Sequence, residues 1–220
     1  QVDAIVLVPI DSKALVQPAV EAVRKGIPVI NIDIQLDAQL LEQAGVEVAF
    51  VGPDNFAAAY EVGKLLGKKL RNEDKVAIIE GLAAADNARQ RKRGFIKAIE
   101  EKGLRLVASE PADWETEKAA EVFQAMWMRY PDLKAVYCSN DAMALGVLQQ
   151  MQEKKCYLPV VGFDNDAVMK EFLSTGKLVA TADIFSSQMA VRGIEFALDV
   201  LEGRIENRGV HSTAYEIIKQ

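Results

Sequence analysis

Short apolar runs alternate with longer segments of helical periodicity along the whole chain. Most of the runs are continuous rather than strictly alternating, which is typical of strands buried on both faces of a sheet. They cover residues 4–8, 29–32, 46–51, 76–79, 105–108, 135–138, 160–163, 178–182 and 215–218. Strands that are regularly separated by helices predict βαβ units. We therefore expect an α/β fold with doubly wound parallel sheets.

The segments between these runs carry apolar residues at helical spacing. The expected helices cover residues 14–23, 39–43, 55–70, 87–102, 115–130, 141–152, 167–173 and 187–201. Asp11 and Ser12 are candidate N-caps of the first helix, and Gly26 ends it. About nine strands can form one sheet or two smaller ones, and no Gly/Ser-rich linker divides the chain.

Composition and charge narrow the class of protein. The chain has 220 residues, half of them hydrophobic, and a net charge of −6. The acidic balance argues against a nucleic-acid partner, because duplex binding needs a basic surface. No apolar run reaches the roughly 20 residues of a membrane span. Residues 1–9 lack the basic start of a signal peptide, so we expect either no export or a leader already removed.

The residues that catalysis or metal binding would need are scarce. The single histidine, His211, and the two cysteines, Cys138 and Cys156, are too few for a zinc site, and we expect both thiols to be buried. The serine-hydrolase elbow, the phosphate-binding loop and the dinucleotide fingerprint are missing. Asp33 and Asp164 can in principle act as a carboxylate pair on a glycoside, but nothing favours that over plain hydroxyl binding. We expect no catalytic residues, no metal and no cofactor.

Polar residues follow most of the predicted strands, at the edge where ligands bind in doubly wound sheets. Asp33, Asn140 and Asp164 each come directly after a strand, and each can also be a helix N-cap. Capping does not explain Arg89, in the first turn of its helix, or Trp114, in a loop. We expect the neighbours of Arg89 in this basic run, residues 91–93, to form a solvated face.

This set of side chains suits a polyhydroxylated ligand. Carboxylates accept hydrogen bonds from hydroxyl groups, a guanidinium donates a fork, and an amide does both. An aromatic ring can cover the apolar C–H face of a sugar.

Several strings resemble the periplasmic sugar-binding proteins of the ribose-binding type. The resemblance runs through the whole chain, and its most specific parts are SNDAMALG at residues 139–146 and VGFD at residues 161–164. It implies a periplasmic-binding-protein-like fold of type I, in which two doubly wound parallel-sheet lobes are joined by a hinge. The N-terminal lobe would hold residues 1–53 and 185–212, and the C-terminal lobe residues 54–184 and 213–220.

The resemblance also implies the function and the site. Such a protein captures a monosaccharide or small polyol between its lobes and delivers it to an ABC transporter permease, with a chemoreceptor as a further partner. It works in the periplasm, or anchored outside the membrane of a one-membrane bacterium. Matched position by position, the ligand-binding residues would be Asp33, Arg89, Trp114, Asn140, Phe163 and Asp164.

The chain departs from the ribose-binding pattern in three places. Ile34 and Ile184 stand where that pattern has an arginine and a glutamine, so we expect a less polar or smaller ligand than ribose, such as a deoxy-sugar, a short polyol or a furanose. In addition, two βα units expected before Val2 are missing, which leaves an unpaired sheet edge. A truncated chain, proteolysis, or an edge covered by a partner chain would each explain this.

Two other functions use the same fold. One is the effector-binding core of a sugar-responsive transcription regulator, which would need an upstream DNA-binding segment. The other is the ligand-sensing ectodomain of a membrane receptor. The acidic charge fits the importer better than the regulator.

Overall fold

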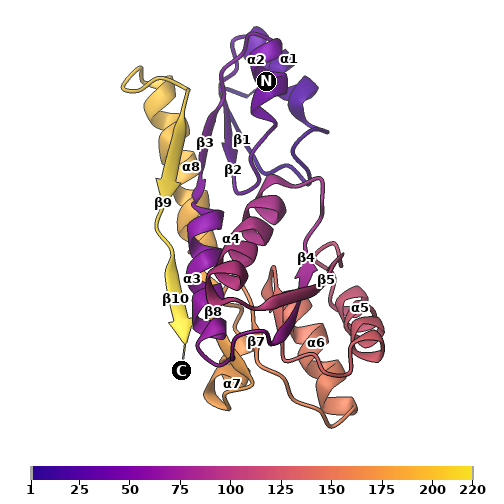
Figure 1. Cartoon of the computed structure of the whole chain (residues 1–220). Coiled ribbons are helices and arrows are strands. Elements are labelled where there is room, and N and C mark those ends of the chain that lie inside the picture. The colour runs from indigo at the N-terminus through magenta and orange to yellow at the C-terminus, as the bar shows by residue number, and fades with distance from the viewer. Residues whose placement is uncertain (1, 220) are drawn as a thin grey trace. The chain divides into compact units, whose positions relative to one another are not determined.

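The computed structural model describes residues 2–219, in which strands and helices alternate up to the last two strands, which follow each other directly (Figure 1). The chain divides into two compact units. Unit 1 consists of Gln1–Asp54, Ala84–Asn87 and Ile184–Ala214, and unit 2 of Asn55–Ala83, Ala88–Asp183 and Tyr215–Gln220. The lobe boundaries expected from the sequence stay a prediction. The units divide the chain at nearby positions, and unit 1 also includes Ala84–Asn87.

Unit 1 contains a four-stranded parallel sheet. Its strands, in spatial order, are β1 (Ile5–Leu7), β2 (Val29–Ile32), β3 (Ala49–Pro53) and β9 (Val210–Thr213). Every residue of β2 and β3 is buried, as expected for inner strands with helices on both faces. Because β1 and β9 stand at the two ends of the order, each pairs on one side only among the residues that the structure describes.

Helices cover both faces of the unit 1 sheet. They are α1 (Val16–Arg24), α2 (Ala38–Gln43) and α8 (Ser186–Leu201). On one face, Val16 and Val20 of α1 pack with Val29 of β2 and Leu41 of α2. On the other face, Ala197 of α8 packs against residues of β2 and β3. The alternation of side chains along β2 therefore supplies both cores.

Unit 2 contains a six-stranded sheet. In spatial order its strands are β10 (Glu216–Lys219), β8 (Leu178–Asp183), β7 (Val160–Val161), β6 (Ala135–Cys138), β4 (Lys75–Glu80) and β5 (Arg105–Pro111). All neighbouring pairs are parallel except β10 with β8.

Five helices complete unit 2: α3 (Asn55–Gly67), α4 (Asp86–Lys102), which begins at the boundary with unit 1, α5 (Thr116–Arg129), α6 (Asp141–Glu153) and α7 (Met169–Ser174). Phe123 of α5 and Val147 of α6 pack with Ile79 and Cys138 of the sheet. Tyr137, the neighbour of Cys138 in β6, instead contacts Phe95 of α4, with ring centroids 5.3 Å apart. The sheet thus separates two cores and presents its strand ends to the loops between them.

The expected α/β class and the parallel sheets are confirmed. The strands expected from the sequence do not include β9, because its residues are mostly exposed and contain no apolar run. The expected burial of both thiols is only half right: Cys138 is buried, whereas Cys156 is half-buried.

Candidate functional site

Polar and aromatic side chains lie at the carboxyl ends of the parallel strands of unit 2. Trp114 lies between β5 and α5, Asn140 lies between β6 and α6, and Phe163 and Asp164 lie in the loop after β7. Ligands of doubly wound sheets bind outside these strand ends. The structure therefore brings four of the six expected site residues to one edge of the unit 2 sheet.

Arg91 contacts several of the groups at this edge of the sheet. Its side chain is 3% exposed. It donates from Nε to Asn55 Oδ1 at 2.8 Å and from Nη1 to the Ser139 carbonyl at 2.9 Å. The same Nη1 lies 3.4 Å from Asp164 Oδ1. A buried charge needs several such partners, and they hold this guanidinium in one orientation.

Two aromatic rings flank the same guanidinium. Arg91 Cζ lies 3.7 Å from the ring centroid of Phe163 and 5.5 Å from that of Trp114. Both distances are in the range of cation–π contacts. Phe163 is fully buried, whereas Trp114 is only half-buried. Trp114 is therefore the ring that can offer a face to a ligand, and Phe163 supports Arg91 from behind.

A glycine makes room for the Trp114 ring. A Cβ atom at Gly81, just after β4, would lie 2.1–2.3 Å from three atoms of that ring. The indole therefore packs directly on the backbone of Gly81, and α4, which carries Arg91, starts a few residues later.

Backbone strain marks three of the expected site residues. Asp33, Trp114 and Asp164 have φ angles of 65°, 72° and 110°. Positive φ is uncommon outside glycine and persists only where the surroundings enforce it, as at many ligand sites.

Asn140 can act both as a helix N-cap and as a ligand-binding residue, the two roles that its position after a strand allows. Its Oδ1 accepts a hydrogen bond from the Met143 N–H at 2.9 Å and so caps α6. In the part of the chain described, its Nδ2 has no hydrogen-bond partner. The amide can therefore cap the helix with its oxygen and donate to a ligand with its nitrogen.

The two remaining expected residues are Asp33 and Arg89. Asp33 follows β2 and belongs to unit 1. Arg89 is exposed, and its Nη1 donates to the Ala83 carbonyl at 3.2 Å. The contacts with Trp114, Phe163 and Asp164 described above are made by Arg91, two residues farther along α4.

The expectation that Arg91 is solvated is wrong. The basic run suggested a solvent-exposed charged face, but the helical spacing of Arg91 with apolar residues indicates that its side chain is buried. Ala88, Arg91 and Phe95 are spaced i, i+3 and i+7, and all three are buried. Lys92 is half-buried and pairs with Glu80 at 2.7 Å, so only Arg93 of these three residues is exposed.

One buried carboxylate lies beneath the site. Asp141, the first residue of α6, is fully buried. Burial, and next the nearby Asp164 charge, raise its pKa to about 7, against hydrogen bonds from the Asp166 N–H and the Thr181 hydroxyl. Burial also raises the pKa values of Tyr137 and Cys138, so neither ionises near neutral pH.

Ile34 and Ile184, the two departures from the ribose-binding pattern, are buried in unit 1 with exposed fractions of 9% and 3%. They bring apolar side chains to positions where polar ones were expected.

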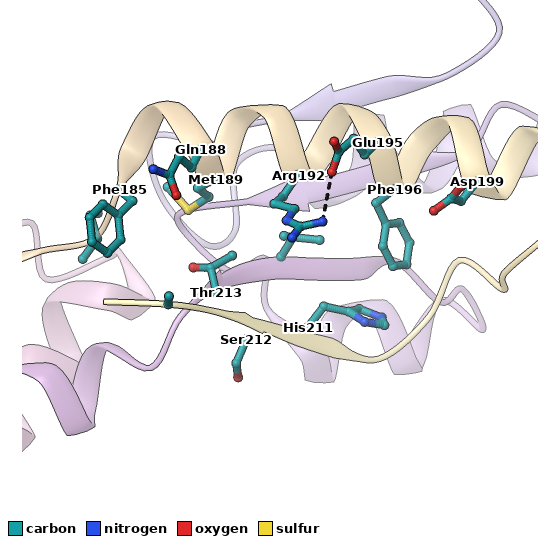
Figure 2. A pocket seen from close by; sticks show the side chains of 13 residues that line it. Phe185, Gln188, Met189, Arg192, Glu195, Phe196, Asp199, His211, Ser212 and Thr213 are labelled. Carbon is teal, nitrogen blue, oxygen red and sulfur yellow. Dashed lines mark hydrogen bonds and ion pairs between the residues drawn. The ribbon is translucent and has the colours of Figure 1, made fainter. Parts of the chain in front are cut away.

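Unit 1 also contains a cavity of about 370 Å³ between α8 and β9 (Figure 2). Arg192 and Glu195 form an ion pair of 3.1 Å at this cavity, and the His211 ring packs on Phe196 with centroids 4.5 Å apart. None of the six expected ligand residues lines it. Arg192 pairs with Glu195 of the same lining, and Asp199 pairs with Arg204 outside it.

Residues 2–219 contain no group of three or more His, Cys, Asp or Glu side chains that could hold a metal ion. No helix among them is long and apolar enough to cross a membrane.

Residues 1–205 match the family model of the periplasmic binding protein domain. The chain is 42% identical to a D-ribose/D-allose-binding protein of Pseudomonas aeruginosa over 99% of its own length and 70% of the relative. It is 34% identical to a ribose import binding protein of Escherichia coli, over 89% of its own length and 64% of that relative. The chain is thus shorter than both.

Solved structures of ABC transporter solute-binding proteins are also similar to this chain. An ABC transporter solute-binding protein from Burkholderia multivorans, with an unknown ligand represented as α-D-erythrofuranose, superposes with a TM-score of 0.95 at 40% identity, covering 99% of this chain and 78% of that one. A solute-binding protein from Actinobacillus succinogenes with bound D-allose gives 0.93 at 32% identity, covering 100% and 79%. The expected resemblance is confirmed, and these relatives are sugar-binding transport proteins rather than enzymes.

Proposed function

This chain belongs to the periplasmic binding protein family, and we propose that it captures a small sugar or polyol and delivers it to the permease of an ABC importer. The observation that carries the proposal is the arrangement around Arg91. A buried guanidinium, a half-buried indole, a carboxylate and an amide nitrogen lie at one sheet edge of unit 2. These groups bind hydroxyls and ring faces, and none is arranged for bond cleavage.

We propose that Trp114 covers the apolar face of the sugar and that Arg91, Asn140 and Asp164 bind its hydroxyl groups. Phe163 holds the Arg91 guanidinium in place, since its ring is buried against it. Asp33 in unit 1 stays a proposed ligand residue, and so does Arg89. The protein would bind its ligand without chemical change, in the periplasm or anchored outside the membrane of a one-membrane bacterium.

The ligand that we propose is smaller or less polar than ribose, such as a furanose, a deoxy-sugar or a short polyol. Ile34 and Ile184 support this, because each replaces a polar partner of the ribose-binding pattern with a buried apolar side chain. The relative from Burkholderia, at 40% identity, carries an unknown ligand that is represented as α-D-erythrofuranose.

Isothermal titration of the chain tests the function and the ligand class together. The panel holds D-ribose, D-allose, D-erythrose, a deoxy-sugar and short polyols. We expect one of the smaller or less polar compounds to bind at least about tenfold more tightly than ribose, a difference of about 1.4 kcal/mol. Tight ribose binding would overturn the ligand class, and binding of no compound would overturn the function.

The same titration identifies the ligand-binding arginine. Arg91→Lys keeps the charge but loses the planar fork, so we expect its affinity to fall by at least about tenfold. Arg93→Lys, on the exposed face of the same helix, is the matched control and should bind like the parent chain. Arg89→Lys is the third variant. If Arg89→Lys loses affinity while Arg91→Lys keeps it, the role belongs to Arg89.

A further inference from the structure

Asp141 holds the loop that carries Phe163 and Asp164 on both sides of Asp164. Its backbone N–H donates to the Phe163 carbonyl at 2.7 Å. Its carboxylate accepts from the Asp166 N–H at 2.9 Å. One residue of α6 is therefore hydrogen-bonded to the loop just before and just after Asp164, whose backbone is strained at a φ of 110°.

Thr181 of β8 extends this network. Its hydroxyl lies 2.9 Å and 3.0 Å from the two carboxylate oxygens of Asp141, and its oxygen accepts from the Asn165 N–H at 3.2 Å. A Cβ atom at Gly162 would lie 1.9 Å from Asp141 Oδ1, so only glycine leaves room for the carboxylate there. The loop, α6 and β8 are thus joined through one buried acid.

We propose that Asp141 is a positioning residue, which in its ionised form holds Phe163 and Asp164 in the arrangement that receives the sugar and on protonation loosens it. This inference rests on the proposed function. An ionised carboxylate only accepts hydrogen bonds, and the two groups that the structure directs at its oxygens, the Asp166 N–H and the Thr181 hydroxyl, both donate. Protonation replaces one acceptor with a donor and breaks this match.

The surroundings of Asp141 place the change near neutral pH. Burial raises its pKa to about 7, with the Asp164 and Asp166 charges adding to the effect. Cys138 in β6 also faces it, and it is un-ionised there because burial raises the thiol pKa. Farther out, Arg91 of α4 lies 3.4 Å from Asp164, and Asp183 of β8 binds the Asn165 side chain at 2.9 Å. The groups that shift the Asp141 pKa most are hydrogen-bond donors and carboxylates.

Affinity measured against pH tests the proposal. With the tightest sugar or polyol of the panel, we expect the dissociation constant to rise by about tenfold between about pH 8 and about pH 5.5, the equivalent of one hydrogen bond. Asp141→Asn cannot titrate, so its affinity should not change with pH across this range. His211→Gln removes the only histidine, the side chain that ordinarily titrates here, and should keep the parent profile.

Two further measurements keep the test decisive if Asp141→Asn folds poorly. Thr181→Val removes one donor to the carboxylate, so the midpoint of the profile should move to higher pH, while Thr181→Ser should leave it in place. As the pH falls, sugar affinity should fall, but the free energy of unfolding should rise. The pKa of Asp141 is raised from 3.8 in the unfolded chain to about 7 in the folded one. The stability that Asp141 contributes is therefore complete below pH 3.8 and is lost as the pH rises to about 7.

The outcomes are distinct. A parent profile that does not change with pH, or an Asp141→Asn profile equal to that of the parent, overturns the positioning role while leaving the sugar-binding function intact. A pH dependence that disappears in His211→Gln also overturns it. Failure to bind any sugar at about pH 8 overturns the proposed function itself.

Discussion

Gly162 shows how closely the loop of unit 2 is fitted to the residues beneath it. A Cβ atom there would lie 1.9 Å from Asp141 Oδ1 and 3.5 Å from Ala144 Cβ. The first distance is far inside van der Waals contact. The obstacle is a carboxylate held by two donors, so it cannot swing aside without losing them.

We therefore expect Gly162→Ala to lower the free energy of unfolding by about 2 kcal/mol or more, as overpacked buried sites do. Chemical denaturation followed by circular dichroism measures this. Gly67→Ala is the matched control, because a Cβ there would meet only the flexible side chain of Lys102, at 3.4 Å or more. That variant should be neutral or slightly stabilising. Equal losses in both variants would show that the Asp141 contact is not the cause.

At the scale of single elements, Asn140 caps the N-terminus of α6 with its Oδ1 atom and can donate to a ligand with its Nδ2 atom. Asn140→Asp keeps the oxygen that accepts from the Met143 N–H but loses the Nδ2 donor. We expect stability within about 0.5 kcal/mol of the parent, since both residues are good N-caps. Sugar affinity should fall by about tenfold, as for one lost hydrogen bond.

Asn140→Ala is the matched comparison, because it removes both atoms. It should lose the same affinity and in addition about 1 kcal/mol of stability. Thermal unfolding and titration of the two variants separate the roles. Full sugar affinity in Asn140→Asp would leave Asn140 with the capping role alone.

Strands that contain an apolar run were predictable from the sequence, including β1, β5 and β10 at the ends of the two sheets, whereas β9 was not. The strands β2, β4 and β6 contain continuous apolar runs because helices cover both of their faces. The exposed strand β9 has no such run, and only its pairing with β3 makes it a strand. Arg91 was missed for a related reason: a charged residue on a buried helix face looks like part of a solvated run unless the spacing is weighed above the charge.

The constellation around Arg91 was only partly predictable. Position-by-position resemblance placed Trp114, Asn140, Phe163 and Asp164 after their strands, where the topology gathers them. The supporting contacts from Asn55, Gly81 and Asp141 depend on how helices and loops pack across the sheet. No local pattern in the sequence carries that information.

At the scale of the whole chain, one face of α8 is apolar but exposed. Val191, Ile194, Leu198 and Leu201 follow helical spacing and are 45–54% exposed. A Cβ at Gly193, on the inner side of α8, would contact Ile32 of β2 and Val6 of β1. The helix thus lies over β1, the strand at the end of the spatial order. A contiguous apolar face of this kind favours association.

We expect the chain as it stands to self-associate through this face, and Ile194→Lys with Leu198→Lys to abolish the association. Sedimentation velocity at several concentrations measures this, and binding of a hydrophobic dye should fall in parallel. Both side chains are half exposed and lysine is a good helix former, so stability should change by less than about 1 kcal/mol. Gln188→Lys adds charge on another flank of α8, at the cavity of unit 1, and should leave association unchanged. A parent chain that stays monomeric at every concentration would show that this face alone does not drive association.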